Sequence, residues 1–475
     1  MSNRPTGTLE RLNSWASRSV TLKLLVIGLL ILILLIPASM LDGLIYERLS
    51  LRDQAQAEVS SKWGGQQTLG GPVLSVPYNY AVAAPTDDDP DRTVARRGYA
   101  HFLPDNIDVS GELRPEERYR GIYVVVLYNT RLRLRGNFGA LDPAALNLPA
   151  GALEWDKALL SVGISDMTGV NAAIEAQLGT TTLELGPGIP TNEVFGSGAS
   201  VPVDLSAGRS ELAFDFSLDL NGSGALYFRP FGKRTTVDLR SDWAAPSFAG
   251  TFLPETRNVS DAGFTAGWEV LHLNRNYPQQ GRGNFLPQVN GGTDTYVDDY
   301  RAYSFDGNGA DGEDRFGVKL LLPVDEYKKT QRSTKFAVLF IFITFLTFFF
   351  IEVLNRKRLH PIQYLLIGAA IVLFYVLLLS FSEHIAFNVA YWLCSGIIVA
   401  LITGYSYFAL RNARLTGLVA AMLLVCYVFF FSLLQLEDYA LLLGSIGLLL
   451  ILGTIMYLTR NIDWYALQKG PNPPV

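Results

Sequence analysis

One acid–histidine pair is the clearest candidate for chemistry in this 475-residue chain. Glu383 and His384 follow directly on a long apolar stretch, where an ionisable pair is costly unless it faces protein or water. Histidine titrates near neutrality, so an activity that used the pair would vary between about pH 5 and 8. If the pair lies at an outer surface, it is merely solvated. We favour that interpretation and keep Glu383 and His384 as a candidate polar site.

Other residue types that could do chemistry are not arranged as a site. The four histidines are scattered, and none has a zinc-ligand spacing. The sequence contains neither a P-loop nor a Gly-x-Ser-x-Gly nucleophile motif. The acidic residues of 87–91 lie beside Pro85 and Pro90, which favours a solvated loop over a metal site. We therefore expect no cofactor, no metal and no enzymatic activity.

Three arginines suggest an anion site but have a simpler explanation. Arg131, Arg133 and Arg135 alternate with leucines, a pattern typical of a strand with one buried and one solvated face. We expect them on a solvated sheet face, on a strand adjacent to the β-branched and aromatic run 122–128.

Six apolar runs are long enough to cross a bilayer, which requires about 20 residues each. They cover residues 24–41, 336–354, 362–382, 386–410, 415–436 and 439–459. Glu352 is the only charge inside the last five. Only 17% of the chain is charged, against about 25% in soluble proteins. This composition excludes a soluble enzyme, a disordered chain and a nucleic-acid binder, and it predicts contact with the lipid bilayer.

The short connections predict the orientation of these spans, because basic residues accumulate in cytoplasmic loops. The connections around residues 383–384 and 437–438 contain no Lys or Arg. The expected topology determinants are Arg356, Lys357, Arg358, Arg411 and Arg414. Tails 1–23 and 460–475 are then cytoplasmic and residues 42–335 periplasmic. Four basic residues between 328 and 335 favour the opposite orientation, but long domains translocate largely regardless of charge. The first run could alternatively be a cleaved signal peptide.

Residues 42–335 carry 28 basic and 38 acidic side chains and form the expected outer domain. Residues 42–63 favour a helical stalk. Beyond them, period-two alternation predicts strands, clearest in 211–220, with residues 225–228 returning as the second strand of a hairpin. Frequent Gly, Pro and Asn favour a β-rich, sandwich-like domain. Both cysteines lie in the spans, so this domain must be stable without disulfides.

One internal similarity raises the possibility of duplication. Phe102–Ser110 and Phe252–Ser260 are identical at five of nine positions. Each copy precedes an apolar run. Duplication into two similar lobes and a chance turn motif both remain open.

With this architecture, the sequence resembles the CreD family of bacterial inner-membrane, cell envelope integrity proteins. The resemblance extends from the first span through the last. Its main segments are Arg358–Ile367, Ser382–His384, Ala440–Ser445 and Thr459–Tyr465, with Gly71–Val73, Arg120–Tyr123, Ser247–Phe248 and Phe252–Pro254 outside the membrane.

The resemblance implies the bacterial inner membrane and a role in envelope integrity, and it implies no reaction. We expect a non-enzymatic protein whose periplasmic domain binds an envelope protein, glycan or lipid. The alternative is a transporter or lipid-handling protein that uses the C-terminal helices.

Overall fold

The computed structural model describes residues 20–83, 93–149, 151–206, 211–286, 314–322, 326–355, 357, 359–436 and 439–460. The expected acidic loop 87–91, Arg356, Arg358 and residues 437–438 lie outside this described part, as does most of each tail. The chain divides into two compact units. One comprises Met1–Leu51 with Val324–Val475, and the other comprises Arg52–Pro323.

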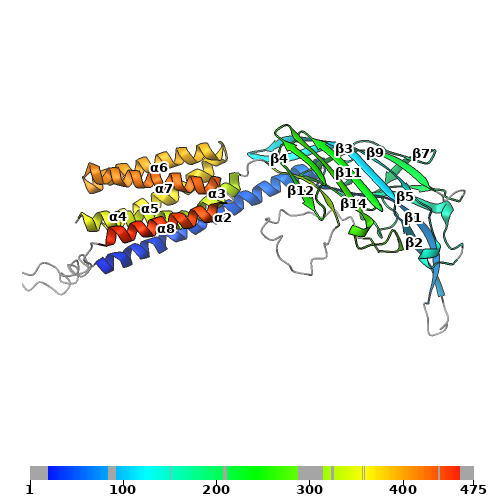
Figure 1. Ribbon diagram of the computed structural model, residues 1–475, viewed down its shortest axis with the longest axis horizontal. Coiled ribbons are helices and arrows are strands. Elements are labelled where there is room, and N and C mark those ends of the chain that lie inside the picture. Colours follow the sequence, from blue (N-terminus) through cyan, green and yellow to red (C-terminus); the bar gives the residue numbers. More distant parts are fainter. Residues whose placement is uncertain are drawn as a thin grey trace, which may run out of the picture. The chain divides into compact units, whose positions relative to one another are not determined.

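The first unit is helical (Figure 1). Its elements are α2 (Val20–Trp63, which continues into the second unit), α3 (Glu326–Thr334), α4 (Ala337–Leu354), α5 (Pro361–Ser382), α6 (Phe387–Leu410), α7 (Ala413–Gln435) and α8 (Ala440–Thr459). Within the described residues, six helices are long and apolar enough to cross a membrane. This confirms the expectation of six apolar helices. The residues expected to form a stalk continue the first helix without interruption to Trp63.

Local sequence explains where these helices begin and end. Pro361 occupies the first turn of α5, where its missing N–H costs nothing, and His360 caps that helix by accepting from the Ile362 N–H. Asn412 caps α7 in the same way. Arg411, which ends α6, adopts φ +46°. Such short connections make consecutive helices antiparallel neighbours.

Close packing joins α2 to the other helices of this unit. Leu34 of α2 lies over Gly368 of α5, where an added Cβ would clash with the leucine side chain. Ile27 and Leu41 are also buried in the same apolar core. Glycine at position 368 therefore allows the first helix to approach the bundle closely.

The second unit is β-rich, which confirms the predicted fold class (Figure 1). Its strands are β1 (Gln67–Ala83), β2 (Thr93–Phe102), β3 (Asn106–Arg120), β4 (Tyr123–Phe138), β5 (Ala158–Ile164), β6 (Ile174–Leu178), β7 (Thr181–Pro187), β8 (Gly198–Val203), β9 (Leu212–Ser223), β10 (Ala225–Phe228), β11 (Arg234–Ser241), β12 (Pro246–Gly250), β13 (Thr256–Ser260), β14 (Gly263–Leu271), β15 (Gln280–Arg282) and β16 (Phe316–Leu320).

These strands form one long, folded sheet of two layers. The first layer has the order β12-β16-β10-β1-β5-β8, with β2 attached to β1 and β15 attached to β2. The second layer has the order β6-β9-β4-β3-β11-β14-β13, and β7 pairs with both layers. Aromatic side chains fill the space between them, as where Trp268 of β14 packs on Phe316 of β16 at 5.9 Å between ring centroids.

The alternating residues 211–220 form β9 as expected. The prediction that residues 225–228 pair with this strand in a hairpin is wrong. Phe214, Phe216, Leu218 and Leu220 are buried on the inner face. The strand pairs with β4 and β6, however, and β10 pairs with β1 and β16 of the other layer. Gly224, with φ +69°, lets the chain cross between layers where a hairpin would have returned beside itself.

The expectation of two adjacent strands in 122–135 is also wrong. Tyr123–Phe138 is a single 16-residue strand, β4. Asn129 and Thr130 lie between the two expected strands, but both pair with β3 and β9 without interruption. The first half of β4 is largely buried on both faces, and its second half is buried on one face only. The sequence pattern changes between the two halves, so a single strand resembles two separate strands.

Candidate functional site

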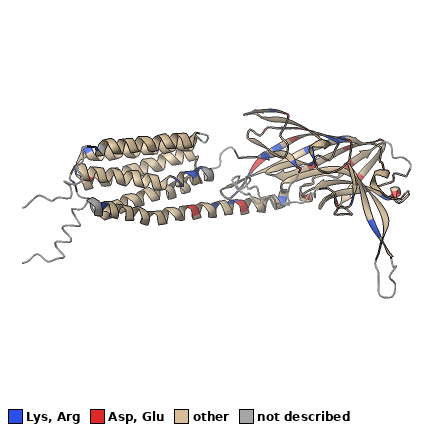
Figure 2. Cartoon of the chain, turned by 60° about the horizontal axis from the view of Figure 1, so that its bottom comes forward, with Lys and Arg blue, Asp and Glu red and all other residues tan. Residues whose placement is uncertain are grey.

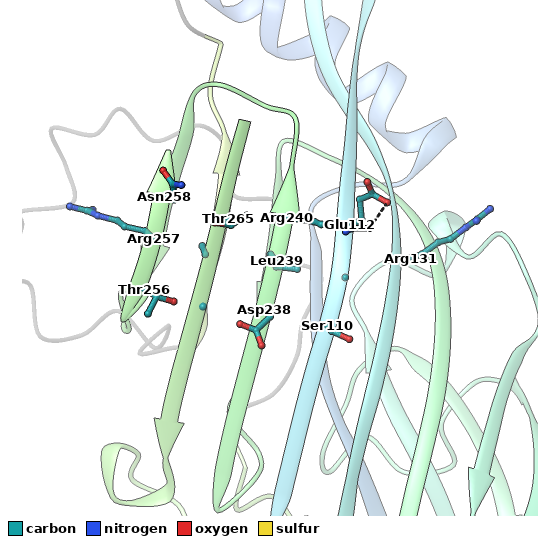
Figure 3. Close-up of a pocket in the computed structure, with 13 residues that line it drawn as sticks. Ser110, Glu112, Arg131, Asp238, Leu239, Arg240, Thr256, Arg257, Asn258 and Thr265 are labelled. Atoms are coloured by element: carbon teal, nitrogen blue, oxygen red, sulfur yellow. Dashed lines mark hydrogen bonds and ion pairs between the residues drawn. The ribbon is translucent and has the colours of Figure 1, made fainter. Parts of the chain in front are cut away.

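A polar groove crosses the outward face of the second layer (Figure 3). It is open and measures about 740 Å³. Its polar residues come from five strands and are Ser110, Glu112, Arg131, Asp238, Arg240, Thr256, Arg257, Asn258 and Thr265.

Strand register places most of these side chains in rows. Asp238 lies beside Ser110 of β3 and Gly267 of β14. Arg240 lies beside Glu112 and Thr265, one row further along β11. The residues between them on β11 point into the core, because successive side chains of a strand alternate between faces. The alternation that directs apolar side chains of β11 into the core therefore also directs Asp238 and Arg240 outward into the groove.

Gly267 keeps the floor of the groove low. A Cβ at this position would lie 2.7 Å from Thr256 Oγ1 and 3.0 Å from Asp238 Oδ1. Any larger residue would occupy space between those two side chains. The depression therefore depends on a glycine that faces outward.

Only some charges of the groove are neutralised by neighbours. Arg114 lies 2.9 Å from Glu112 and Arg240 lies 3.5 Å from it, and these hydrogen bonds and charges hold the pKa of that carboxyl below its ordinary value. Asp238 and Arg257 have no ion pair within the described part of the chain. Asp238 is therefore free to meet a charged or hydrogen-bonding ligand in the groove, whereas Arg257 lies in the row of Ala266 and Leu239, whose side chains point to the other face of the layer.

The three alternating arginines lie on the outward face of β4, as the interpretation of a solvated sheet face predicts. Arg131 pairs with Asp219 at 3.1 Å, while Arg133 and Arg135 both reach Asp215. Their guanidinium groups are satisfied by carboxylates of the neighbouring strand β9. Only Arg131 lines the groove.

Glu383 and His384, the candidate polar pair, differ in their burial in the structure. The Glu383 side chain is about one-tenth exposed, with Arg48 Nε of α2 and the Tyr327 hydroxyl of α3 each 3.4 Å from Oε1. His384 is exposed. The carboxylate thus joins three helices of the helical unit, while His384 is a surface residue.

Three of the residues expected to determine topology lie within the described part of the chain, at or near helix ends. Lys357 lies in the connection between α4 and α5, Arg411 lies in the connection between α6 and α7, and Arg414 lies in the first turn of α7. All three are exposed. Figure 2 shows that charged residues of the shorter apolar helices lie near the helix ends, whereas the long helix α2 also carries them along its middle.

A partly buried ion pair was not anticipated from the sequence. Glu352 of α4 is 4% exposed and lies 2.7 Å from Lys23 Nζ of α2. The Tyr364 hydroxyl and the Leu359 N–H donate to the same carboxylate, each at 3.2 Å. The signal available was that Glu352 is the only charge inside the last five spans, but no sequence pattern indicates its partner.

A second buried cluster was also missed. His101 is fully buried between Ser75 Oγ, 2.8 Å from Nδ1, and Glu193 Oε2, 3.0 Å from Nε2. Ser75 and His101 are cross-strand neighbours on β1 and β2. Ser75 is buried as well, so it is not accessible to a substrate, and the cluster fixes the segment that carries Glu193 to the sheet. Within the described residues, no group of His, Cys, Asp and Glu could hold a metal ion.

Comparison with known proteins identifies the same family over nearly the whole chain. The family model described as "CreD: Inner membrane protein CreD" matches residues 19–465. The inner membrane protein CreD of Escherichia coli (strain K12) is 35% identical over 442 residues, which cover 92% of each chain. The similarity therefore includes both the helical unit and the β-rich unit.

Proposed function

The chain belongs to the CreD family of inner membrane proteins, and on that basis we propose that it supports cell-envelope integrity as a non-enzymatic binding protein. In this proposal the β-rich unit binds an envelope protein, glycan or lipid. The observation that carries it is the polar groove, which is open, about 740 Å³ in volume and lined by the Asp238 carboxylate, a group that makes no ion pair within the described residues.

The proposed orientation makes the groove accessible to the envelope. Lys357 and Arg411 lie in short connections and Arg414 lies in the first turn of α7, and these basic residues favour a cytoplasmic side for those helix ends. Residues 42–335 would then be periplasmic, with both chain termini in the cytoplasm.

A complementation experiment tests the binding proposal. In a strain that lacks its own CreD protein, leakage of a periplasmic enzyme would report envelope integrity. We expect the native chain to reduce leakage and the double variant Asp238→Lys/Arg240→Glu to fail, since it reverses two charges of the groove. Glu184→Lys, an exposed change on β7 outside the groove, should complement fully. Full complementation by the groove variant at equal expression would reject the groove as the binding site.

One observation favours the alternative of a transporter or lipid-handling protein. A carboxylate inside a membrane span is costly and often belongs to a functional pathway, and Glu352 is such a group. Its carboxylate already accepts from Lys23, Tyr364 and the Leu359 N–H. We therefore rank a structural ion pair above a transport site, and substrate-dependent flux in liposomes would reverse that ranking.

A further inference from the structure

The folded sheet has two ends, and strand β13 forms one of them. Its order begins with β12 and ends with β13, which follow each other directly in the chain. Strand β13 pairs with β14 on one side. No described strand pairs with its other side, and all five of its residues are exposed. An edge of this kind presents unpaired N–H and C=O groups to an incoming strand.

The two similar sequence segments, Phe102–Ser110 and Phe252–Ser260, supply a direct comparison for this edge. The two similar segments both lead from a first-layer strand into a second-layer strand, which begins at Asn106 in one copy and at Thr256 in the other. In each copy a two-residue turn and an antiparallel strand follow. Strands β3 and β13 therefore hold equivalent positions in the two copies.

The two equivalent strands differ in their second neighbour. Strand β3 is flanked by β4 and also by β11, which runs parallel to it from the Asn106–Arg234 pair to the Leu113–Ser241 pair. At β13, the place that corresponds to β11 is not filled by any described residue. In Figure 3, β13 is the outermost of the strands that carry the groove.

The exposed fractions of equivalent side chains also differ between the two segments. Ile107 and Val109 of β3 are 2% and 4% exposed, whereas Val259, the counterpart of Val109, is 46% exposed. Leu103 is 4% exposed, but its counterpart Leu253 is 68% exposed. Val259 thus lacks the cover that β11 gives Val109, while Leu253 lies before the strand, where its counterpart Leu103 bonds the Gln279 carbonyl through its backbone N–H.

Arg257 determines what kind of strand would fit. It replaces Ile107 at the equivalent position, is exposed, and makes no ion pair within the described residues. In the first copy, Thr235 of β11 lies beside Ile107 and Val237 lies beside Val109. An incoming strand would therefore complement β13 with an acidic residue at the first of these positions and an apolar residue at the second.

We propose that the free edge of β13 binds an extended segment of a partner protein, parallel to β13, with an acidic residue against Arg257 and an apolar residue against Val259. The proposal rests on the proposed binding function and specifies the partner as a peptide strand. A second copy of this chain fits less well, because a two-fold axis would pair β13 antiparallel with itself and, at full overlap, set Arg257 opposite Val259 with no acidic partner.

The probe for the test is a labelled eight-residue peptide with the sequence of β11 in which glutamate replaces the residue corresponding to Thr235. Fluorescence anisotropy would measure its binding to the full chain in lipid nanodiscs. We expect saturable binding, and at least about tenfold weaker binding for Val259→Pro, which removes an edge N–H. A peptide with N-methylated backbone amides should not bind.

A charge exchange separates recognition from misfolding. The variant Arg257→Glu should bind the glutamate peptide at least about tenfold more weakly and should recover affinity for a peptide with arginine at that position. Failure of the exchanged pair to recover would contradict the acid–Arg257 contact. Absence of saturable binding, or binding insensitive to both Val259→Pro and N-methylation, would reject the edge.

Two further outcomes would also overturn the proposal and leave the proposed function intact. One is binding that appears only when residues 290–310 are deleted, since the chain itself would then compete for the edge. The other is binding lost in Asp238→Lys/Arg240→Glu but unchanged in Val259→Pro, since the groove would then be the site. Loss of complementation by the groove variant with normal peptide binding by the edge would support both sites separately.

Discussion

At the scale of single residues, Lys23 and Glu352 show how a charge is accommodated inside the helical unit. The carboxylate is buried, and three donors from α2, α5 and the α4–α5 connection surround it. Breaking such a pair leaves the remaining charge without its partner, which is more destabilising than removing both charges together.

We expect Lys23→Met to lower the stability of the helical unit by about 1–3 kcal/mol, because a buried carboxylate loses its cation. The double variant Lys23→Met/Glu352→Gln should cost less than the sum of its two single changes. Thermal unfolding in detergent would measure both. Strict additivity would show that the two side chains are not coupled.

Glu383 should behave as part of a contact with Arg48 and His384 as a surface residue. Glu383→Gln and Arg48→Gln should reduce thermal stability by similar small amounts, and the double variant should add little, since both remove the same 3.4 Å contact. His384→Asn is the matched control and should leave stability and envelope function unchanged. A defect in His384→Asn equal to that of Glu383→Gln would restore the acid–histidine pair as a functional unit.

Asp215 should contribute stability to the β-rich unit in a pH-dependent way. The Arg133 hydrogen bonds, with Arg135 nearby, hold the pKa of its carboxyl below the ordinary value. Because the folded pKa lies below the unfolded one, the contribution is complete above about pH 4 and is lost as the pH falls through the folded pKa.

Asp215→Asn should therefore destabilise the β-rich unit at pH 7 by less than about 1 kcal/mol, because the pair is solvent-screened. The difference from the native chain should shrink as the pH falls below about 4. Denaturant unfolding followed by circular dichroism would measure it, with the neighbouring change Ser217→Ala as control. A difference that grows toward acid pH would contradict the sign of the pKa shift.

At the scale of elements, the β-rich unit has the properties of an independent domain. Its strands pair among themselves, its apolar core is continuous, and it contains no cysteine. Strand β4 and its neighbours β3 and β9 form its longest ladders. Stability from burial alone is reasonable for a unit of this size.

Residues 64–325 expressed alone should accordingly be soluble and β-dominated by circular dichroism. The fragment should melt at the same temperature with and without reductant, because it has no thiols to pair. A helix-dominated spectrum, or a melting point that depends on reductant, would contradict an independent β-rich domain.

At the scale of the whole molecule, the main open prediction is the orientation across the membrane. In a background without Cys394 and Cys426, Glu184→Cys should react with an impermeant thiol reagent in intact spheroplasts. Lys357→Cys should react only after the membrane is opened, because short basic connections favour the cytoplasm. Labelling of Lys357→Cys from outside would invert the proposed topology.

Features that depend on local pattern could be predicted from the sequence. Apolar length predicts the six helices, since a bilayer core sets the number of residues a helix needs. Alternation in residues 211–220 places Phe214 and Phe216 inside, since successive strand side chains face opposite ways. The same alternation predicts that the arginines of β4 lie on a solvated face.

Contacts between distant residues could not be predicted in this way and follow from the three-dimensional fold. Strand β10 pairs with β1 and not with its sequence neighbour β9, because Gly224 lets the chain cross between layers. Lys23 reaches Glu352 across 329 positions of sequence, and the groove assembles from five strands. Such contacts depend on strand order and helix packing, which local propensity and hydrophobic periodicity do not specify.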